Sequence, residues 1–336
     1  MRSSIRPVGP RSSGARRGTA RGLSGALLRV DPPASSLQVD HGGSGHSAVT
    51  ISVVRAMRCR QWLKNVLVVG APVTAGQLLR ADVLAGTFVA LLVFSAAASS
   101  IYLLNDVRDA EADRAHPDKR QRPVACGDLS ERTAATTGIS LGLLALAGGF
   151  LWAVPLGLTI AVYLVVQLAY VAGLKDQPAI DLAVVSSGFL LRAIAGGTAT
   201  GIGLSPWFLL VAAFGSLFMV AGKRYSEIHT LGVESLSRAS LQRYSDSYLR
   251  FIWTMAAGVT VMVYILWVLN GLQASRPEDF WGPVSVGPFV LGLLRYASHI
   301  DRGEAEAPEE IALNDHYLQI TSLIWLGTLV LRATMG

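Results

Sequence analysis

Three aspartates follow one another at helical spacing directly after a long apolar run, in the stretch NDVRDAEAD that begins at Asn105. If a helix continues through this stretch, each residue turns by about 100°. One face then carries the side chains of Asn105, Asp106, Asp109 and Asp113. Carboxylates crowded on one face repel one another, and a divalent cation offsets that repulsion. All-oxygen ligands suit Mg²⁺, so the spacing predicts a Mg²⁺ site, the alternative being a solvated loop.

A cluster of bases follows these acids. Lys119, Arg120 and Arg122 come directly after Pro117, which ends the helix. Ammonium and guanidinium groups bind some phosphate oxygens, and a metal ion held by the acids binds others. The two clusters together predict a site for a diphosphate at the membrane surface. No zinc spacing, nucleophilic triad, P-loop or dinucleotide motif accompanies them in the sequence.

A second polar group surrounds a short turn between two apolar segments, in AYVAGLKDQPAIDLAVV. Tyr170, Lys175 and Asp181 flank this turn, and Pro178 suits the first turn of the next helix. Arg192 lies on the same helical face as Asp181, about 16 Å deeper. An arginine at that depth is costly unless it faces a polar cavity or a partner. We expect Asp181 to be a second metal-side ligand and Arg192 to line a cavity. An internal ion pair or carbonyl clamp is the alternative for Arg192.

Two more groups of bases are predicted at the same membrane surface. Lys223, Arg224 and Tyr225 follow one apolar segment, and Lys64 and Asn65 lie in RCRQWLKN at the start of another. Bases at such positions also anchor helices by the positive-inside rule. Because more bases surround the acids than orientation requires, we assign these five residues to substrate binding.

The composition is that of a membrane protein. The 336 residues are 51% hydrophobic and 15% charged, whereas soluble domains carry about 25% charged residues. The net charge of +6 comes largely from an arginine-rich beginning of the chain, so we do not expect nucleic-acid binding. Crossing a bilayer takes roughly 20 apolar residues, which predicts an all-α polytopic bundle of nine spans. These are about 63–79, 83–104, 133–152, 154–173, 179–199, 205–221, 251–270, 281–299 and 313–334.

The charge of the connecting loops predicts the orientation of this bundle. Lys and Arg concentrate in alternate loops, which by the positive-inside rule face the cytoplasm. The acids and the bases of the expected active site lie at the same face. The loops are 105–132, 174–178, 222–250 and 300–312.

Other segments have simpler interpretations. Residues 1–48 are rich in Arg, Gly, Ser and Pro, which predicts a disordered basic cytoplasmic tail before a catalytic membrane domain at 49–336. The stretch 233–250 is amphipathic and predicts a helix lying on the inner leaflet, or else a solvated linker. Cys59 and Cys126 match no metal or redox spacing, and we expect no disulfide.

From about residue 50 onward, the chain resembles the UbiA-type intramembrane prenyltransferase superfamily. NDVRDAEAD matches the NDxxDxxxD motif of that family, and the group from Tyr170 to Asp181 matches its second motif. The resemblance implies a nine-helix bundle with its active site at the cytoplasmic face. It implies Mg²⁺ as the cofactor.

The roles implied by the resemblance fall on two walls of one site. Asn105, Asp109 and Asp113 would hold Mg²⁺ and a diphosphate, with Asp106 in support. Lys175 and Asp181 would complete the opposite wall. Aromatic-substrate relatives have a DxxxD second motif, whereas Asp176 and Asp181 are five positions apart here, which puts a second metal ion in doubt. The implied catalytic residues are Asp109, Asp113 and Asp181.

Within the superfamily, the segments RQWLKNVLV, AYVAGLK and FGSLFMVAGKRY are most similar to a branch that acts on a phosphorylated sugar. Such enzymes transfer ribose 5-phosphate from phosphoribosyl diphosphate to a polyprenyl phosphate, such as decaprenyl phosphate, and release diphosphate. The product feeds synthesis of cell-wall arabinan. These two substrates and membrane lipid are the expected partners, and the resemblance leaves a homo-oligomer open.

Two other functions fit parts of the sequence. An aromatic prenyltransferase of the quinone or haem pathways would use the same acids to bind a prenyl diphosphate. The additional bases at 119–122 and 223–224 favour a sugar 5-phosphate over that donor. A transporter of anions would need ionisable residues at mid-membrane on several helices, yet Arg192 is nearly alone there.

Overall fold

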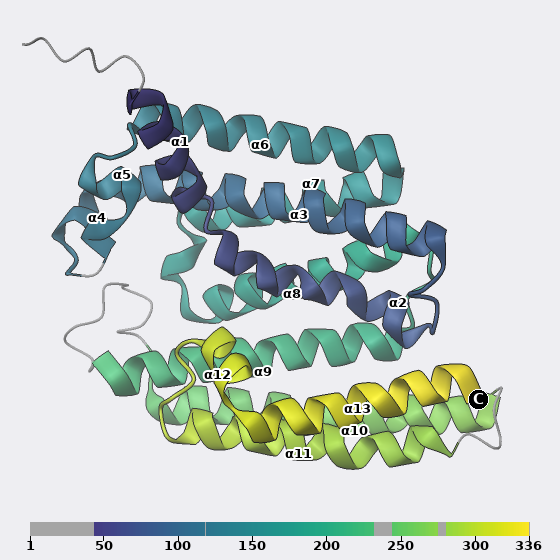
Figure 1. Ribbon diagram of the computed structural model, residues 1–336. Helices are drawn as coiled ribbons and strands as arrows, with labels where there is room; N and C mark the ends of the chain where they lie inside the picture. The colour runs from purple at the N-terminus through teal and green to yellow at the C-terminus, as the bar shows by residue number, and fades with distance from the viewer. Residues whose placement is uncertain (1–43, 118, 232–243, 275–279, 336) are drawn as a thin grey trace, which may run out of the picture. The chain divides into compact units, whose positions relative to one another are not determined.

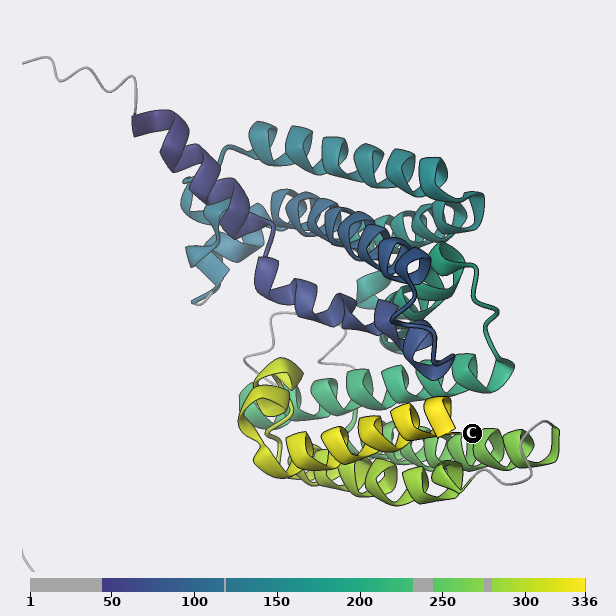
Figure 2. The ribbon, with the colours of Figure 1, turned by 45° about the vertical axis from the view of Figure 1, so that its right-hand side comes forward.

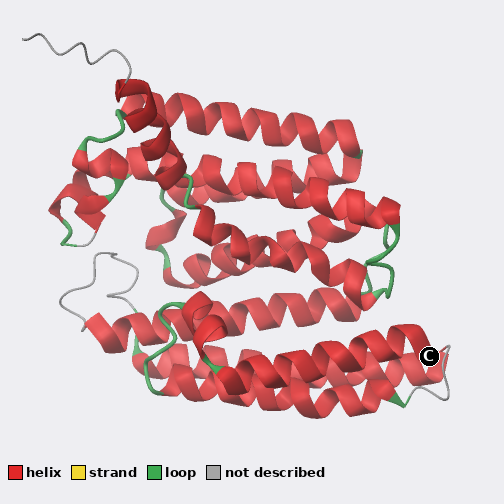
Figure 3. Ribbon diagram, viewed as in Figure 1, coloured by secondary structure: helices red, strands yellow, loops and turns green. Residues whose placement is uncertain are grey.

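The regular structure is entirely helical in the residues that the computed structural model describes, which are 44–117, 119–231, 244–274 and 280–335 (Figure 3). The predicted all-α class is confirmed for these ranges. Most of the predicted tail at 1–48 lies outside them, but its last residues belong to α1 (Ser44–Ala56). The amphipathic stretch predicted at 233–250 lies outside the described residues up to position 243, and α10 begins at Asp246.

Within the described ranges, six helices are long and apolar enough to cross a membrane. All six coincide with predicted segments, because runs of apolar residues of this length form helices whose backbone groups are satisfied within the segment. They are α3 (Ala81–Arg108), α6 (Glu131–Trp152), α7 (Val154–Ala172), α8 (Pro178–Thr200), α9 (Pro206–Leu231) and α10 (Asp246–Ala274).

The other three predicted spans have a different character. The segment 63–79 is divided between a 3₁₀ helix, η1 (Cys59–Val69), and a single turn, α2 (Gly70–Thr74). The last two segments form α11 (Trp281–Asp301) and α13 (His316–Met335), joined through α12 (Pro308–Asn314). None of these helices is among the six that are apolar enough to span. Nine spans are therefore a prediction that the described residues support only in part.

The long helices lie side by side in a bundle, and the two views agree on which are neighbours (Figures 1 and 2). In one group, α3 packs against α6, α7, α8 and η1. In the other, α9 pairs with α10, and α11 pairs with α13. Each group has an apolar core, the first around Phe94 and Ile160 and the second around Phe218 and Ile300. Helices α8 and α9 contact each other and join the groups.

Glycines allow η1 and α3 to approach α8 closely. A Cβ added at Gly196 of α8 would lie 2.0 Å from the carbonyl oxygen of Val68, and one at Gly86 of α3 would lie 2.6 Å from that of Ala199. Small residues at helix contacts permit such backbone approach within membranes. The approach of η1 matters for function, because it brings the region of Lys64 against α8.

Polar side chains gather at one end of the bundle. The last turns of α3, α7 and α9 and the first turn of α8 lie there, beside the short helices α4 (Ala110–Ala115) and α5 (Pro123–Cys126) (Figure 1). Gly173 ends α7 with a φ of 150°, a conformation that favours glycine, and Pro178 opens α8. This sharp turn places the second polar group next to the first.

Candidate active site

The first acidic motif keeps its helical spacing across a small break. Helix α3 ends at Arg108 and α4 begins at Ala110, with Asp109 between them. The N–H of Asp109 still donates to the carbonyl of Asn105 at 2.9 Å, and that of Asp113 donates to the carbonyl of Asp109 at 2.8 Å. The predicted continuation of the helix through the motif is therefore confirmed, apart from this break.

Two arginines hold the buried carboxylates of this motif. Arg58 Nη2 lies 2.5 Å from Asp106 Oδ1, and Arg122 Nη1 lies 2.6 Å from Asp113 Oδ2 and 3.4 Å from Asp106 Oδ1. Asp106 is 1% exposed, and its Oδ2 atom is buried with no hydrogen-bond partner among the described residues. One oxygen of the most deeply buried carboxylate of this motif thus remains available to a further ligand.

A cavity of about 220 Å³ opens directly at these pairs. Three guanidinium-bearing side chains and one carboxylate share its wall, so the local charge is positive. Arginine in a recess binds phosphate oxygens through paired hydrogen bonds. The lining residues are Arg55, Ala56, Arg58, Asp106, Gln121, Arg122 and Pro123.

Asp109 connects the motif to the turn between α7 and α8. Its Oδ1 atom accepts a hydrogen bond from Lys175 Nζ at 2.6 Å, and Lys175 lies in η3 (Leu174–Asp176). Nearby, Arg108 Nη2 donates to the carbonyl of Ala172 at 2.9 Å. The structure therefore brings the two predicted walls into direct contact. Both members of the Asp109–Lys175 pair are partly accessible to solvent.

Asp181 is the centre of a buried network. Its Oδ1 atom accepts from the hydroxyl of Tyr170 at 2.6 Å and from Arg224 Nη2 at 3.0 Å, and its Oδ2 atom accepts from Arg224 Nε at 2.8 Å. Arg224 Nη1 also donates to Glu227 at 2.7 Å. Asp181 is 0% exposed, so these contacts join α7, α8 and α9 in the interior.

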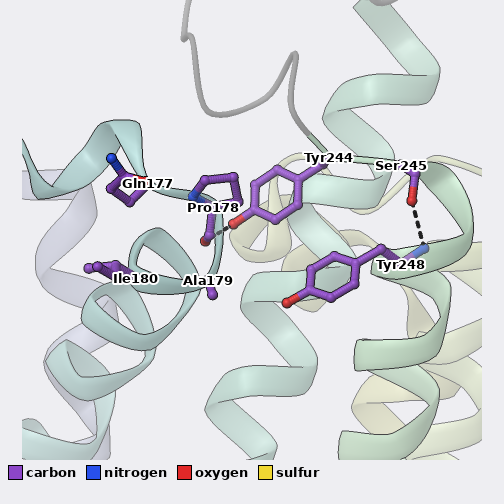
Figure 4. A pocket seen from close by; sticks show the side chains of 7 residues that line it. All are labelled: Gln177, Pro178, Ala179, Ile180, Tyr244, Ser245 and Tyr248. Carbon is purple, nitrogen blue, oxygen red and sulfur yellow. Dashed lines mark hydrogen bonds between the residues drawn. The ribbon is translucent and has the colours of Figure 1, made fainter.

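A larger cavity of about 630 Å³ lies beside this network, between the first turn of α8 and the beginning of α10 (Figure 4). The rings of Tyr244 and Tyr248 stack there, with centroids 6.0 Å apart, and the Tyr244 hydroxyl donates to the carbonyl of Pro178. Burial raises the pKa of Tyr244, and the charge of Asp181 raises it further. This cavity therefore lies next to the wall formed by Tyr170, Lys175 and Asp181, but the carboxylate of Asp181 does not line it. It is lined by Gln177, Pro178, Ala179, Ile180, Tyr244, Ser245 and Tyr248.

A further group of charges surrounds Lys64. The ammonium group of Lys64 is within electrostatic range of Arg58, Arg192, Lys223 and Glu309, and it has no hydrogen-bond partner in the described part of the chain. Three of these four neighbours are positive. Such a group attracts a polyanion, and Lys64 and Lys223 lie within electrostatic range of each other, but their assignment to substrate binding stays a prediction.

Other predicted residues lie in more internal positions. Arg192 is buried, and it donates to Asn65 Oδ1 at 2.7 Å and to the carbonyl of Gly188 at 2.7 Å. Its guanidinium also lies 4.9 Å from the ring centroid of Phe94. These contacts agree with the alternative prediction for Arg192, in which its guanidinium is held by groups inside the protein. Asn65 is one of those groups. Tyr225 packs within the core cluster of α9 instead of facing the acids.

Two predicted bases lie at the edge of the site. Lys119 and Arg120 belong to η2 (Lys119–Gln121), the turn that carries the chain from α4 to Arg122. Arg120 is exposed and Lys119 is half-buried. Arg122 pairs with carboxylates of the motif, and the Lys119 and Arg120 assignments remain predictions.

The structure does not gather the acids as the sequence predicts. In the described ranges, no three metal-binding side chains converge on one point. The reason is electrostatic, since arginines draw Asp106 and Asp113 to one side and Lys175 draws Asp109 to another. The donors nevertheless fit Mg²⁺, which binds through one or two carboxylates plus substrate phosphates, and Asp106 Oδ2 is unpartnered in this part of the chain.

Three residues of the site were missed by the sequence analysis. Arg58 was not among the predicted site residues, yet it pairs with Asp106. Glu227 follows Lys223 by one helical turn and lies 3.4 Å from its ammonium group, a spacing visible in the sequence. Glu309 reaches the site from α12, and no local pattern signals that contact.

These features match a known family. The UbiA prenyltransferase family model matches residues 66–323, so the chain belongs to that family. A decaprenyl-phosphate phosphoribosyltransferase of Mycobacterium tuberculosis is 49% identical over 84% of this chain and 95% of its own length. A decaprenyl-phosphate phosphoribosyltransferase of Corynebacterium glutamicum is 47% identical over 91% of this chain and 93% of its own.

Solved structures share the fold at much lower identity. A UbiA homolog from Archaeoglobus fulgidus bound to DMAPP and Mg²⁺ superposes with a TM-score of 0.65 at 17% identity, over 85% of this chain and all of that one. The same homolog bound to GPP and Mg²⁺ gives a TM-score of 0.65 at 18% identity, over 84% of this chain and 99% of that one. Similarity at this level establishes the helical architecture alone.

Asp181→Asn should destabilise the protein far more than Asp109→Asn. The substitution removes the buried charge that pairs with Nε and Nη2 of Arg224, and breaking a buried ion pair costs roughly 3–5 kcal/mol in the free energy of unfolding. The pair of Asp109 is partly exposed, and such pairs contribute about 0–1 kcal/mol. Thermal unfolding in detergent measures both variants. Equal shifts in the melting temperature would contradict this division.

Proposed function

We propose that the protein transfers ribose 5-phosphate from phosphoribosyl diphosphate to a polyprenyl phosphate such as decaprenyl phosphate, releasing diphosphate. The observation that carries the proposal is the 49% identity, over nearly the whole length, to a protein named for that activity. The arginine-lined cavity at the first motif agrees with it, because both substrates carry phosphate groups. The resemblance described in the sequence analysis implies that the product serves the synthesis of cell-wall arabinan.

Two groups of residues divide the recognition of the donor in this proposal. Arg58 and Arg122 line the cavity at the acidic motif and bind the leaving diphosphate. Lys64 and Lys223, which lie within electrostatic range of each other, bind the other phosphate. Lys175, drawn to Asp109 in the present structure, is released to a phosphate oxygen when the donor arrives.

The acids of the first motif fit a metal ion. Asn105, Asp106, Asp109 and Asp113 would hold Mg²⁺, and solved structures of a homolog contain that ion with a prenyl diphosphate. When bound, the ion neutralises negative charge on the diphosphate. Asp181 is already saturated by Tyr170 and Arg224, so we propose that it positions the second wall.

The reaction needs no strong base from the protein. The bond between C1 of the ribose and the diphosphate oxygen breaks, and both electrons leave with the diphosphate. An oxygen of the acceptor phosphate forms the new bond to C1, where positive charge develops in the transition state. The acceptor is already ionised near neutral pH, so no proton has to be removed. The arginines stabilise the departing charge from fixed positions.

An aromatic prenyltransferase is the second candidate. One observation favours it, namely that the homolog of the same fold is described with DMAPP and with GPP, which are prenyl diphosphates. Its identity to this chain is only 17–18%, against 47–49% for the phosphoribosyltransferases. We therefore favour the sugar donor.

The activity itself is the first test. Purified protein with Mg²⁺, decaprenyl phosphate and radiolabelled phosphoribosyl diphosphate should yield a labelled lipid, and chelation of the metal should stop its formation. Thin-layer chromatography of the lipid fraction measures the product. Absence of labelled lipid, combined with transfer from a prenyl diphosphate to an aromatic acid, would refute the proposal in favour of the second candidate.

Asp109→Asn should reduce turnover by at least about 100-fold, because it removes a charged ligand of the metal and diphosphate. The matched control is Asp82→Asn, at the opposite end of the same helix, where an exposed carboxylate pairs with Arg80. We expect that control to keep wild-type activity. Near-wild-type turnover of a folded Asp109→Asn protein would defeat the assignment.

We also propose that the active-site end faces the cytoplasm. In a Cys59→Ser protein, the exposed thiol of Cys126 should react with a membrane-impermeant maleimide in inside-out vesicles but not in intact cells. Asp82→Cys, placed in a background without the native cysteines, reports the opposite end and should show the reverse pattern. Labelling of Cys126 from outside intact cells would reverse the orientation.

A further inference from the structure

The short helix α12 delivers a carboxylate to the group of bases around Lys64. Glu309 Oε1 accepts a hydrogen bond from Gln61 Nε2 at 3.1 Å, which joins α12 to η1 across the site. The other oxygen, Oε2, is buried and has no hydrogen-bond partner in the described residues. Buried carboxylate oxygens normally accept a hydrogen bond. The Oε2 atom of Glu309 is therefore available to accept a hydrogen bond from a bound ligand.

The carboxylate is negatively charged at neutral pH. Partial burial acts to raise the pKa of Glu309, but its own backbone N–H, the charge of Lys64, the hydrogen bond from Gln61 and the charge of Lys223 lower it overall. Lys64 and Lys223 act on Glu309 without forming an ion pair with it. Lys223 Nζ instead donates to the carbonyl of Glu306 at 2.5 Å, which fixes the beginning of α12.

A negatively charged acceptor within electrostatic range of two ammonium groups selects a particular ligand chemistry. Lys64 and Lys223 suit a phosphate, whereas Glu309 repels one and accepts hydrogen bonds only. A ligand that satisfies all three residues carries phosphate and hydroxyl groups close together. A sugar phosphate has both, and the hydrocarbon part of a prenyl diphosphate has no hydroxyl group.

We propose that Glu309 binds the ring hydroxyl groups of the sugar donor and thereby makes the site select a sugar diphosphate over a prenyl diphosphate. The inference rests on the proposed function, because it concerns the donor of that reaction. Neither the acidic motif nor the arginine cavity can make this distinction, since both contact only the diphosphate. Glu309 is a specificity residue that contacts the donor.

The test compares two inhibitors that cannot react. One is the carbocyclic analogue of phosphoribosyl diphosphate, and the other is its counterpart without the two ring hydroxyl groups. Wild-type protein should bind the hydroxylated analogue roughly 10- to 100-fold more tightly, as expected for hydrogen bonds to a charged group. In Glu309→Gln and Glu309→Ala this preference should fall to about threefold or less, with the KM for polyprenyl phosphate unchanged.

The matched control is Glu310→Gln, which changes the exposed neighbouring acid in α12 and should keep the wild-type preference. An unchanged preference in a folded Glu309→Gln protein would overturn the inference. So would equal binding of the two analogues by wild-type protein, a result that requires no variant. Either outcome leaves phosphoribosyl transfer by the wild-type enzyme standing, whereas absence of that transfer is the failure of the proposed function itself.

Discussion

Burial of one carboxylate at the end of a membrane-spanning helix is the constraint on which the site depends. Asp106 is almost completely shielded from solvent, where an isolated ionised carboxylate is costly. Arg58 and Arg122 come from two other segments and offset that cost. The two arginines neutralise the buried charge of Asp106. Their ion pairs therefore hold the segment before η1 and the turn after α4 against the end of α3. Docking of these segments also assembles the arginine-lined cavity.

The site contains a buried ion pair that stabilises the fold and a partly exposed ion pair that contributes little to stability. The pair of Asp181 and Arg224 is buried and joins three helices, and breaking a pair of that kind is strongly destabilising. The pair of Asp109 and Lys175 is partly exposed and contributes little to stability. An incoming polyanion can therefore separate Lys175 from Asp109 at a small cost in free energy. The pair of Asp181 and Arg224 meanwhile keeps the helices in place.

Local sequence patterns predicted the positions of the helices but not the side-chain contacts between segments that are distant in the sequence. Length and hydropathy indicated the six spanning helices, and helical spacing indicated the arrangement of the first acidic motif, because both are properties of neighbouring residues. The contact of Arg58 with Asp106 joins residues 48 positions apart, and that of Gln61 with Glu309 joins residues 248 apart. Only the packing of the bundle brings them together. For the same reason, the divergence of the carboxylates toward different bases could not be anticipated.

The position of Glu309 in the chain suggests how one bundle serves different donors. The buried acids of the motif, Asp106 and Asp113, pair with arginines from other segments, so replacing them also destabilises the fold. Helix α12 belongs to a connection between α11 and α13 and contributes no residue to the first apolar core. Connections tolerate substitution better than the elements they join. Under the proposed function, recognition of the diphosphate is thus tied to the fold, whereas recognition of the group attached to it is free to vary.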